Sequence, residues 1–277
     1  DKSEELFRSF GRFIEGLGGR YITAEDVGTS IKDMDHVRME TKYVTGISKS
    51  LGGSGDPSLL TSFGTYLGIK ASVKFKYKKD SLDGLSIVVQ GLGSVGMELV
   101  KYLSQDGMKI FAYDIDSERL GLAKEEYGII PIGEDEVYDQ DVDIYAPCAL
   151  GATINDETIP RLKCNIIAGA ANNVLKDPDR HARELLHKGI LYAPDYAINA
   201  GGLINVYNEL DDYNRERAFS QAEAIYDILM DIFYKSDKEN IPTTIASDRK
   251  AEERINKIAS LKSFYLPNRR KAVLKDR

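Results

Sequence analysis

The sequence predicts an α/β protein with a doubly wound, Rossmann-type parallel sheet, part of a second α/β domain for a substrate, and C-terminal helices. Apolar, strand-like runs alternate with helical stretches through the middle of the chain, a glycine-rich turn follows the first run, and the last quarter is helical in pattern. This alternation favours parallel strands, because a parallel pair needs a crossover connection that is usually a helix. The expected strands lie near 85–90, 109–114, 142–146, 164–168 and 190–193.

Further elements are expected on both sides of this sheet. Apolar residues over 4–16 recur at helical spacing, and Thr29 or Ser30 can cap a helix that begins near Ile31. The remaining expected elements are short extended segments at 20–24 and 43–47, a long helix over 58–77, a surface helix and loop in the acidic stretch 133–143, and helices from Ile204 onward that break near 239–243 before a basic tail.

The chain is predicted to contain more than one domain, as its length of 277 residues allows. The stretch GGSGDPS at 52–58 is the strongest loop signal in the first quarter and marks the expected boundary. We expect 1–53 to be a remnant of a substrate-binding, catalytic domain and 54–206 to be a nucleotide-binding domain. We expect 207–277 to form a helical segment that packs back on the first domain.

Composition excludes several classes of partner. The net charge of −7 argues against nucleic acid and anionic membranes, and no apolar run approaches membrane-spanning length. Hydrophobic residues make up 42% of the chain, which is enough to bury a core. The two cysteines, Cys148 and Cys164, lie in apolar surroundings and are expected to be reduced and buried, which favours a cytoplasmic protein.

The segment LSIVVQGLGSVGMELVKYL at 85–103 has the spacing of a dinucleotide-binding fingerprint. Gly91 allows a tight turn from strand to helix, Gly93 lets backbone amides approach a pyrophosphate, and Gly96 lets the helix pack closely on the strand. The phosphates would then lie at the positive end of a helix. The loop from Gly91 to Met97 is therefore predicted to bind a dinucleotide.

Asp114 ends the next apolar run, FAYDID, where a carboxylate can accept both hydroxyls of an adenosine ribose. Its negative charge would repel a 2′-phosphate, so the sequence favours NAD over NADP. The alternative is a structural aspartate that forms a turn or caps a helix, and Asp116 competes with Asp114 for the ribose role.

Three further segments place small residues beside polar ones where strands are expected to end: 145–155, 166–175 and 192–205. Ligands of open α/β sheets lie beyond the carboxyl ends of the strands, so these segments are expected to converge there. Asn172, Asn173 and Asn199 could hold a carboxamide or a ribose hydroxyl. Alternatively, they are turn formers whose side chains bond their own backbone.

No metal site is expected. His36, His181 and His187 lack the spacing of a ligand set, and the chain has no HExxH or CxxC motif. Cys148 is interpreted as a packing residue and not as a nucleophile.

Long motifs along nearly the whole chain resemble one enzyme family. RYITAEDVGTS, YVTGIS, SGDPSLLTSFG, GLGSVG, DIYAPCALGATIN, IAGAANN and YAPDYAINAGGLINV together resemble the amino-acid dehydrogenases that act on glutamate, leucine, phenylalanine and valine. The resemblance implies an oligomeric, NAD-dependent enzyme that reversibly deaminates an L-amino acid to its 2-oxo acid and ammonia. It is strongest to members that act on branched-chain amino acids such as leucine, valine and isoleucine.

The resemblance also implies roles for individual residues. Asp26 matches the catalytic aspartate, which exchanges a proton with the substrate amine; otherwise Asp26 would be a carboxylate at the start of the following helix. The side-chain pocket is matched by Ala24, Thr45, Leu203 and Val206. Together, the two lines of argument predict a cofactor-binding set of Gly91, Leu92, Gly93, Ser94, Val95, Gly96, Met97, Asp114, Ala149, Asn172, Asn173 and Asn199.

Two lysines of the family pattern are not matched. Relatives carry them in and near a Gly-rich motif, where one binds the substrate carboxylate and the other activates water, and this chain begins downstream of both. We therefore expect a stretch that is N-terminally truncated and inactive by itself. The alternatives are a non-catalytic NAD-binding or regulatory protein, and the same chemistry on phenylalanine.

Overall fold

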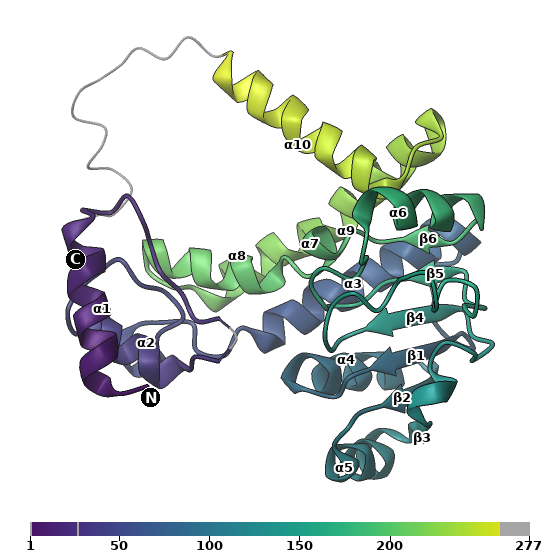
Figure 1. The fold of residues 1–277 in the computed structure, drawn as a ribbon, viewed down its shortest axis with the longest axis horizontal. Coiled ribbons are helices and arrows are strands. Elements are labelled where there is room, and N and C mark those ends of the chain that lie inside the picture. Colours follow the sequence, from purple (N-terminus) through teal and green to yellow (C-terminus); the bar gives the residue numbers. More distant parts are fainter. Residues whose placement is uncertain (1, 27, 261–277) are drawn as a thin grey trace. The chain divides into compact units, whose positions relative to one another are not determined.

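The computed structural model describes residues 2–26 and 28–260, which fall into two compact units. The first, called the α1–α2 unit, comprises the described residues up to 60 together with 202–221. The second, called the sheet unit, comprises 61–201 and 222–260 (Figure 1). The predicted basic tail at 266–277 lies outside the described residues.

The α1–α2 unit is built from short helices and extended segments. Its elements are α1 (Glu4–Gly16), α2 (Ile31–Arg38), η1 (Lys49–Leu51), the first residues of α3 (Ser58–Tyr77), most of α8 (Gly201–Tyr207), η3 (Asn208–Asp211) and the start of α9 (Arg215–Glu239). Ser30, and not Thr29, caps α2, in a capping box with Asp33. The two predicted extended segments meet in one parallel bridge between Thr23 and Val44.

A small apolar core holds this unit together. It is formed by Phe7, Met34, Val37, Val44 and Ile47. These residues come from α1, from α2 and from the segment that precedes η1, so burial of their side chains ties the two helices to the extended segments.

Across the described residues, the sheet unit contains one six-stranded parallel sheet in the order β3-β2-β1-β4-β5-β6 (Figure 1). The strands are β1 (Ser86–Gln90), β2 (Lys109–Tyr113), β3 (Ile130–Pro131), β4 (Ile144–Pro147), β5 (Ile166–Ile167) and β6 (Leu191–Tyr192). The order reverses between β1 and β4, which is where ligands of doubly wound sheets bind. The predicted fold class is therefore confirmed.

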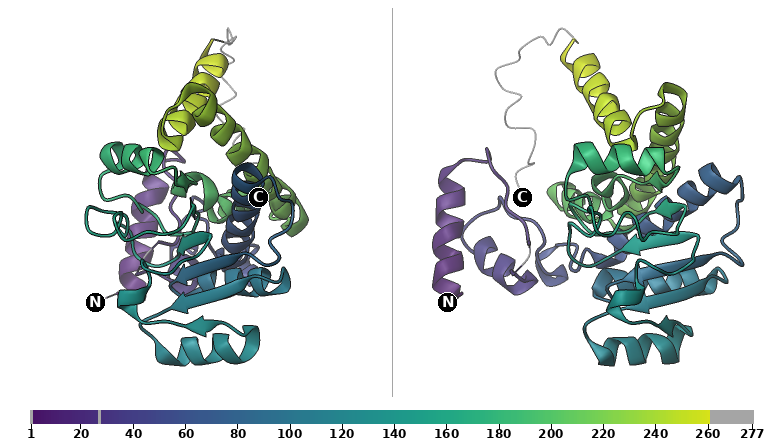
Figure 2. Two further views of the ribbon diagram at one scale, coloured as in Figure 1. Left: turned by 90° about the vertical axis from the view of Figure 1, so that its right-hand side faces the viewer. Right: turned by 45° about the vertical axis from the view of Figure 1, so that its right-hand side comes forward.

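Helices cover and extend this sheet. They are most of α3, α4 (Ser94–Gln105), α5 (Ser117–Tyr127), η2 (Glu134–Glu136), α6 (Pro178–His187), α7 (Asp195–Ile198), most of α9, and α10 (Thr243–Ala259). In Figures 1 and 2, α5 lies at the β3 edge and α6 at the β6 edge. The central strands contribute to an apolar core in which Val88, Tyr145 and Ile167 are fully buried.

The five predicted strands are present, but the structure adds β3, which the sequence analysis missed. This strand has two residues, one of them Pro131, and Ile130 is 40% exposed, so neither length nor apolar pattern indicated it. The acidic stretch 133–143 forms the short η2 and then a turn, where a surface helix and loop were expected.

The two units divide the chain differently from the predicted domains 1–53, 54–206 and 207–277, which stay a prediction about independently folding parts. Among the described helices, none is long and apolar enough to cross a lipid bilayer.

Candidate cofactor and substrate sites

The glycine-rich loop of the sheet unit has a separate structural reason for each glycine. Gly91 has a φ of 103°, and a Cβ there would lie 2.8 Å from the Ala149 Cβ. A Cβ on Gly96 would lie 2.0 Å from the carbonyl oxygen of Gly91, so α4 could not approach the turn. Among the described residues other than its two chain neighbours, a Cβ on Gly93 would meet no atom within 4 Å. Gly91 and Gly96 are therefore required by packing, whereas Gly93 faces open space.

The open space at Gly93 lies at the start of α4. Gly93 is the N-cap residue of this 12-residue helix and makes no side-chain cap hydrogen bond. The Met97 N–H donates to the Gly93 carbonyl at 2.9 Å, so the backbone N–H groups that precede it, from Ser94 to Gly96, are the ones without an acceptor within the helix. The loop therefore combines room and positive backbone dipoles, which suits a pyrophosphate.

Asp114 follows β2 and is 9% exposed. Its carboxylate accepts hydrogen bonds from the backbone nitrogens of Leu92, at 2.5 Å, and Asp116, at 2.8 Å. Asp116 is itself the N-cap of α5. Asp114 thus holds the glycine-rich loop, and since a carboxylate offers about four acceptor positions, it retains capacity for a ligand hydroxyl.

The turns after β4 and β5 are packed against each other. The backbone nitrogen of Ala171 donates to Pro147, and a Cβ on Gly169 would lie 2.2 Å from the same carbonyl oxygen. The Asn199 side chain donates to the Ala170 carbonyl and to Asn172 Oδ1. The structure thus brings Asn172 and Asn199 together.

Asn173 and Ala149 lie on the neighbouring part of these turns. Asn173 has a φ of 51°, which asparagine tolerates better than most residues, and its carbonyl accepts from the Ala152 nitrogen at 2.7 Å. Asn172, Asn173 and Ala149 are exposed, so their side chains are accessible at the carboxyl end of the sheet.

The two cysteines are free thiols, and Cys164 is buried as expected, whereas Cys148 is partly exposed. Burial raises the pKa of the Cys148 thiol to about 11 and that of Cys164 to about 12. A thiol of this kind is protonated near neutral pH and is a poor nucleophile, which agrees with a packing role.

The α1–α2 unit contains a pocket of about 310 Å³. Its described lining residues are Glu25, Asp26, Gly28, Thr29, Gly46, Pro57 and Val206. The backbone nitrogen of Asp26 donates to the Thr29 hydroxyl, which donates in turn to the Asp26 carbonyl. Because Ser30 caps α2, Asp26 is not the helix-start carboxylate that the alternative interpretation required.

The four residues predicted for the substrate pocket have different environments. Val206 lines the pocket, and Thr45 is buried directly before Gly46. Ala24 and Leu203 are exposed and are absent from the described lining, Leu203 with 72% of its surface accessible.

Glu25 is a pocket residue that the sequence analysis missed. Its Oε2 atom is buried without a hydrogen-bond partner among the described residues. Burial, together with the nearby charges of Asp56 and Asp33, raises the pKa of this carboxyl. No sequence signal marked it, because its burial depends on the distant Gly46 segment.

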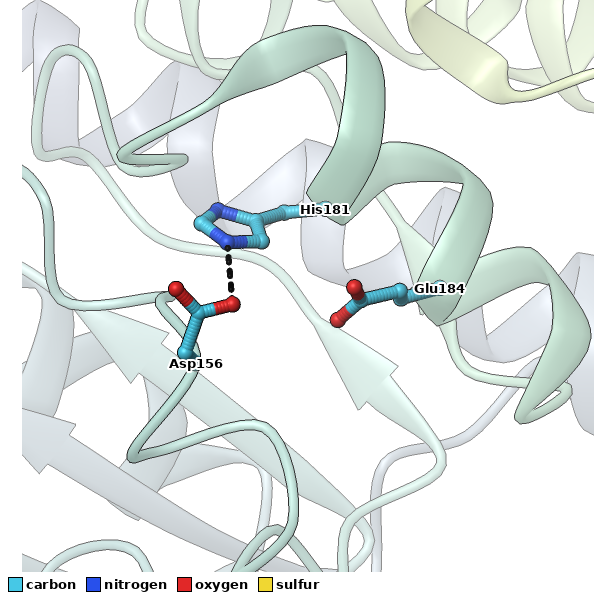
Figure 3. Close-up of side chains that lie close together, drawn as sticks. All are labelled: Asp156, His181 and Glu184. Carbon is cyan, nitrogen blue, oxygen red and sulfur yellow. Dashed lines mark ion pairs between the residues drawn. The ribbon is translucent and has the colours of Figure 1, made fainter.

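Asp156, His181 and Glu184 lie close enough together to suggest a metal site (Figure 3). However, His181 Nδ1 accepts from the Asp177 backbone nitrogen, and its Nε2 lies 3.5 Å from Asp156 and 3.1 Å from an Arg180 guanidinium nitrogen. Arg180 pairs with Asp156 and holds the pKa of that carboxyl below its usual range. These contacts are those of an ion-pair network, and we assign no metal to them.

Comparison with known proteins relates the whole chain to amino-acid dehydrogenases. A family model described as Glutamate/Leucine/Phenylalanine/Valine dehydrogenase matches residues 114–263. Leucine dehydrogenase of Thermoactinomyces intermedius is 51% identical over 99% of this chain and 74% of its own length. Phenylalanine dehydrogenase of the same organism is 42% identical over 98% and 74%, respectively. A crystal structure of L-tryptophan dehydrogenase from Nostoc punctiforme superposes with a TM-score of 0.83 and 44% identity, over 93% of this chain and 74% of that one.

Proposed function

This chain belongs to the Glutamate/Leucine/Phenylalanine/Valine dehydrogenase family and is an amino-acid dehydrogenase, and we propose that it acts with NAD on branched-chain L-amino acids. The reaction is the reversible oxidative deamination of leucine, valine or isoleucine to the 2-oxo acid and ammonia. The observation that carries the substrate assignment is the pocket around Asp26, whose described lining contains no basic side chain.

The cofactor assignment rests on the sheet unit. The open space at Gly93, the uncapped start of α4 and the buried Asp114 fit a dinucleotide. The negative charge of Asp114 favours the ribose hydroxyls of NAD over a 2′-phosphate. When bound, the nicotinamide supplies the acceptor for the hydride that leaves the substrate Cα.

The residues of the α1–α2 unit would act on the substrate. Asp26, which lines the pocket, exchanges a proton with the substrate amino nitrogen. Loss of the Cα hydride leaves an imine, and addition of water to it releases ammonia and forms the 2-oxo acid. Val206 offers an apolar wall to the side chain, while Glu25 and Asp26 favour a neutral side chain over a second carboxylate.

Phenylalanine is the second candidate substrate, because a phenylalanine dehydrogenase is 42% identical to this chain. The higher identity to a leucine dehydrogenase favours the branched-chain assignment. One methylene in an apolar pocket changes specificity by only about 10- to 200-fold, so the order of substrates has to be measured.

The test is a spectrophotometric assay of the complete natural polypeptide that contains these residues. Leucine, valine, isoleucine, phenylalanine, tryptophan and glutamate are compared with NAD and with NADP. The expected result is fastest reduction with a branched-chain substrate and NAD. A higher kcat/KM for phenylalanine or glutamate would overturn the substrate assignment, and a preference for NADP would overturn the cofactor assignment.

We further propose a cytoplasmic homo-oligomer. The low cysteine content supports the location, and the resemblance of the sequence motifs to an oligomeric enzyme family supports the oligomer. Light scattering of the purified protein measures the oligomeric state directly.

A further inference from the structure

Glu209 is a buried carboxylate that lies outside the proposed chemistry. It belongs to η3, directly after the helix that carries Leu203 and Val206, and it is 6% exposed. A carboxylate is costly to bury unless hydrogen bonds stabilise it, so its partners indicate what it holds in place.

Glu209 accepts several hydrogen bonds from one distant segment, 46–54. Glu209 Oε2 accepts from the backbone nitrogens of Gly46 at 2.9 Å and Ile47 at 3.5 Å. Its Oε1 accepts from the backbone nitrogen of Ser54 at 2.8 Å and from the Ser54 hydroxyl. The Glu209 side chain therefore binds both ends of the 46–54 loop to η3. All of these residues belong to the α1–α2 unit.

Gly46 connects Glu209 to the pocket. It lines the pocket together with Asp26 and Val206, and a Cβ on it would lie 3.3 Å from the Glu25 Cβ. The residue before it, Thr45, donates its backbone nitrogen to Thr23 at 2.9 Å, so this segment lies beside the one that leads to Asp26. Glu209 thus links Gly46, in one wall of the pocket, to η3, which directly follows the helix that contributes Val206 to the pocket.

We propose that Glu209 is a positioning residue that sets the width of the substrate pocket and thereby the size of the apolar side chain that it accepts. It does so by fixing Gly46 relative to Val206. This inference rests on the proposed function, because it assigns the pocket around Asp26 to the substrate side chain.

The decisive variant is Glu209→Gln. Glutamine keeps the volume, but its amide has one oxygen, so its NH₂ group must face a backbone N–H donor on either the Gly46 side or the Ser54 side. The Gly46 wall should then be less firmly held. We expect the ratio of kcat/KM for phenylalanine to that for valine to rise about tenfold, mostly through KM, with the affinity for NADH unchanged.

Three further variants separate positioning from general damage. Ser54→Ala removes one donor and leaves the Gly46 contact, so it should shift the ratio in the same direction but less. Glu209→Asp keeps two acceptor oxygens and should restore part of the wild-type ratio. Glu216→Gln changes an exposed glutamate on α9 and should leave the ratio at the wild-type value.

The outcomes distinguish this inference from the proposed function. A wild type that oxidises no amino acid overturns both. An active wild type whose phenylalanine-to-valine ratio is unchanged in Glu209→Gln, or whose variants lose activity by one factor for every substrate, overturns the positioning role alone. If Glu209→Gln is too unstable to assay, Ser54→Ala decides, and an unchanged ratio in that variant contradicts the inference.

Discussion

In the sheet unit, the candidate cofactor residues lie on turns that directly follow strands, whereas the pocket of the α1–α2 unit is assembled from distant parts of the chain. Gly91, Gly93 and Asp114 come within a few residues of β1 or β2. Gly46 and Glu209, which hold the pocket wall, are 163 residues apart. The cofactor site can be predicted from a local motif. The pocket depends on tertiary contacts between segments far apart in the chain.

The two regions also differ in the use of buried charge. Asp114 accepts from Leu92, its near neighbour in the fingerprint, and so supports a turn whose shape the glycines already determine. Glu209 instead accepts from both ends of the 46–54 loop, which lie 155 to 163 residues away in sequence. Removal of the buried carboxylate should therefore perturb the pocket of the α1–α2 unit more than the glycine-rich loop of the sheet unit. Substitutions that fill space should perturb the glycine-rich loop more than the pocket.

The largest effect should come from filling the open space of the sheet unit. Gly93→Val places a branched side chain where a pyrophosphate would lie, so NADH binding measured by calorimetric titration should fall below detection. The circular dichroism spectrum should not change, because the new Cβ has no atom within 4 Å among the described residues beyond its chain neighbours. Gly16→Val, at another open position in the α1–α2 unit, is the matched control. If Gly93→Val keeps its NADH affinity, the loop does not bind the pyrophosphate and is only a structural turn.

The next effect should be confined to the pocket. Asp26→Asn preserves size and much of the hydrogen bonding but removes the titratable proton, so kcat should fall by something on the order of 10² to 10⁴. The affinity for NADH should barely change, because Asp26 lines the pocket of the other unit. Steady-state kinetics and an NADH titration check the two halves of this expectation. A near-normal kcat in Asp26→Asn would contradict the proposed role of Asp26 in proton exchange with the substrate.

A smaller effect is expected at Asp114, where support of the loop and recognition of ribose coincide. Asp114→Ala should weaken NADH binding by about tenfold, the loss typical of a hydrogen bond to a charged group. It should also reduce the ratio of the affinity for NADH to that for NADPH. Asp116→Ala, which removes the cap of α5 and an ion pair with Arg119, should leave the preference for NADH intact. If the Asp116 variant narrows the preference and the Asp114 variant does not, Asp116 is the ribose ligand.

The smallest effect concerns stability at Glu25. Burial raises the pKa of this carboxyl above 4.5 in the folded protein, so the folded state is favoured while the group is protonated. That stability is present below pH 4.5 and is lost as the pH rises through the folded pKa. Glu25→Gln should therefore raise Tm at pH 7 and have less effect at pH 4. An equal shift at both pH values would contradict the assignment of a raised pKa.

Most of the sheet unit was predictable because its signals are local. The alternation of strands and helices, the three glycines and the acid at the end of the second strand are each short-range patterns, although the role of that acid had alternatives. The strand β3 was missed because two exposed residues, one of them proline, carry no such pattern; pairing with β2 alone makes them a strand.

The sequence by itself determined the family, the parallel sheet and the position of the glycine-rich turn, since all of these depend on residues near one another in the chain. Only the tertiary structure decided that Gly93 faces open space, that Asp114 holds the loop, that one oxygen of the pocket residue Glu25 is buried, and that Glu209 is a buried carboxylate bonded to Gly46. The physical reason is that these groups are buried and hydrogen-bonded by segments far apart in the sequence. No local sequence pattern predicts that such segments are in contact.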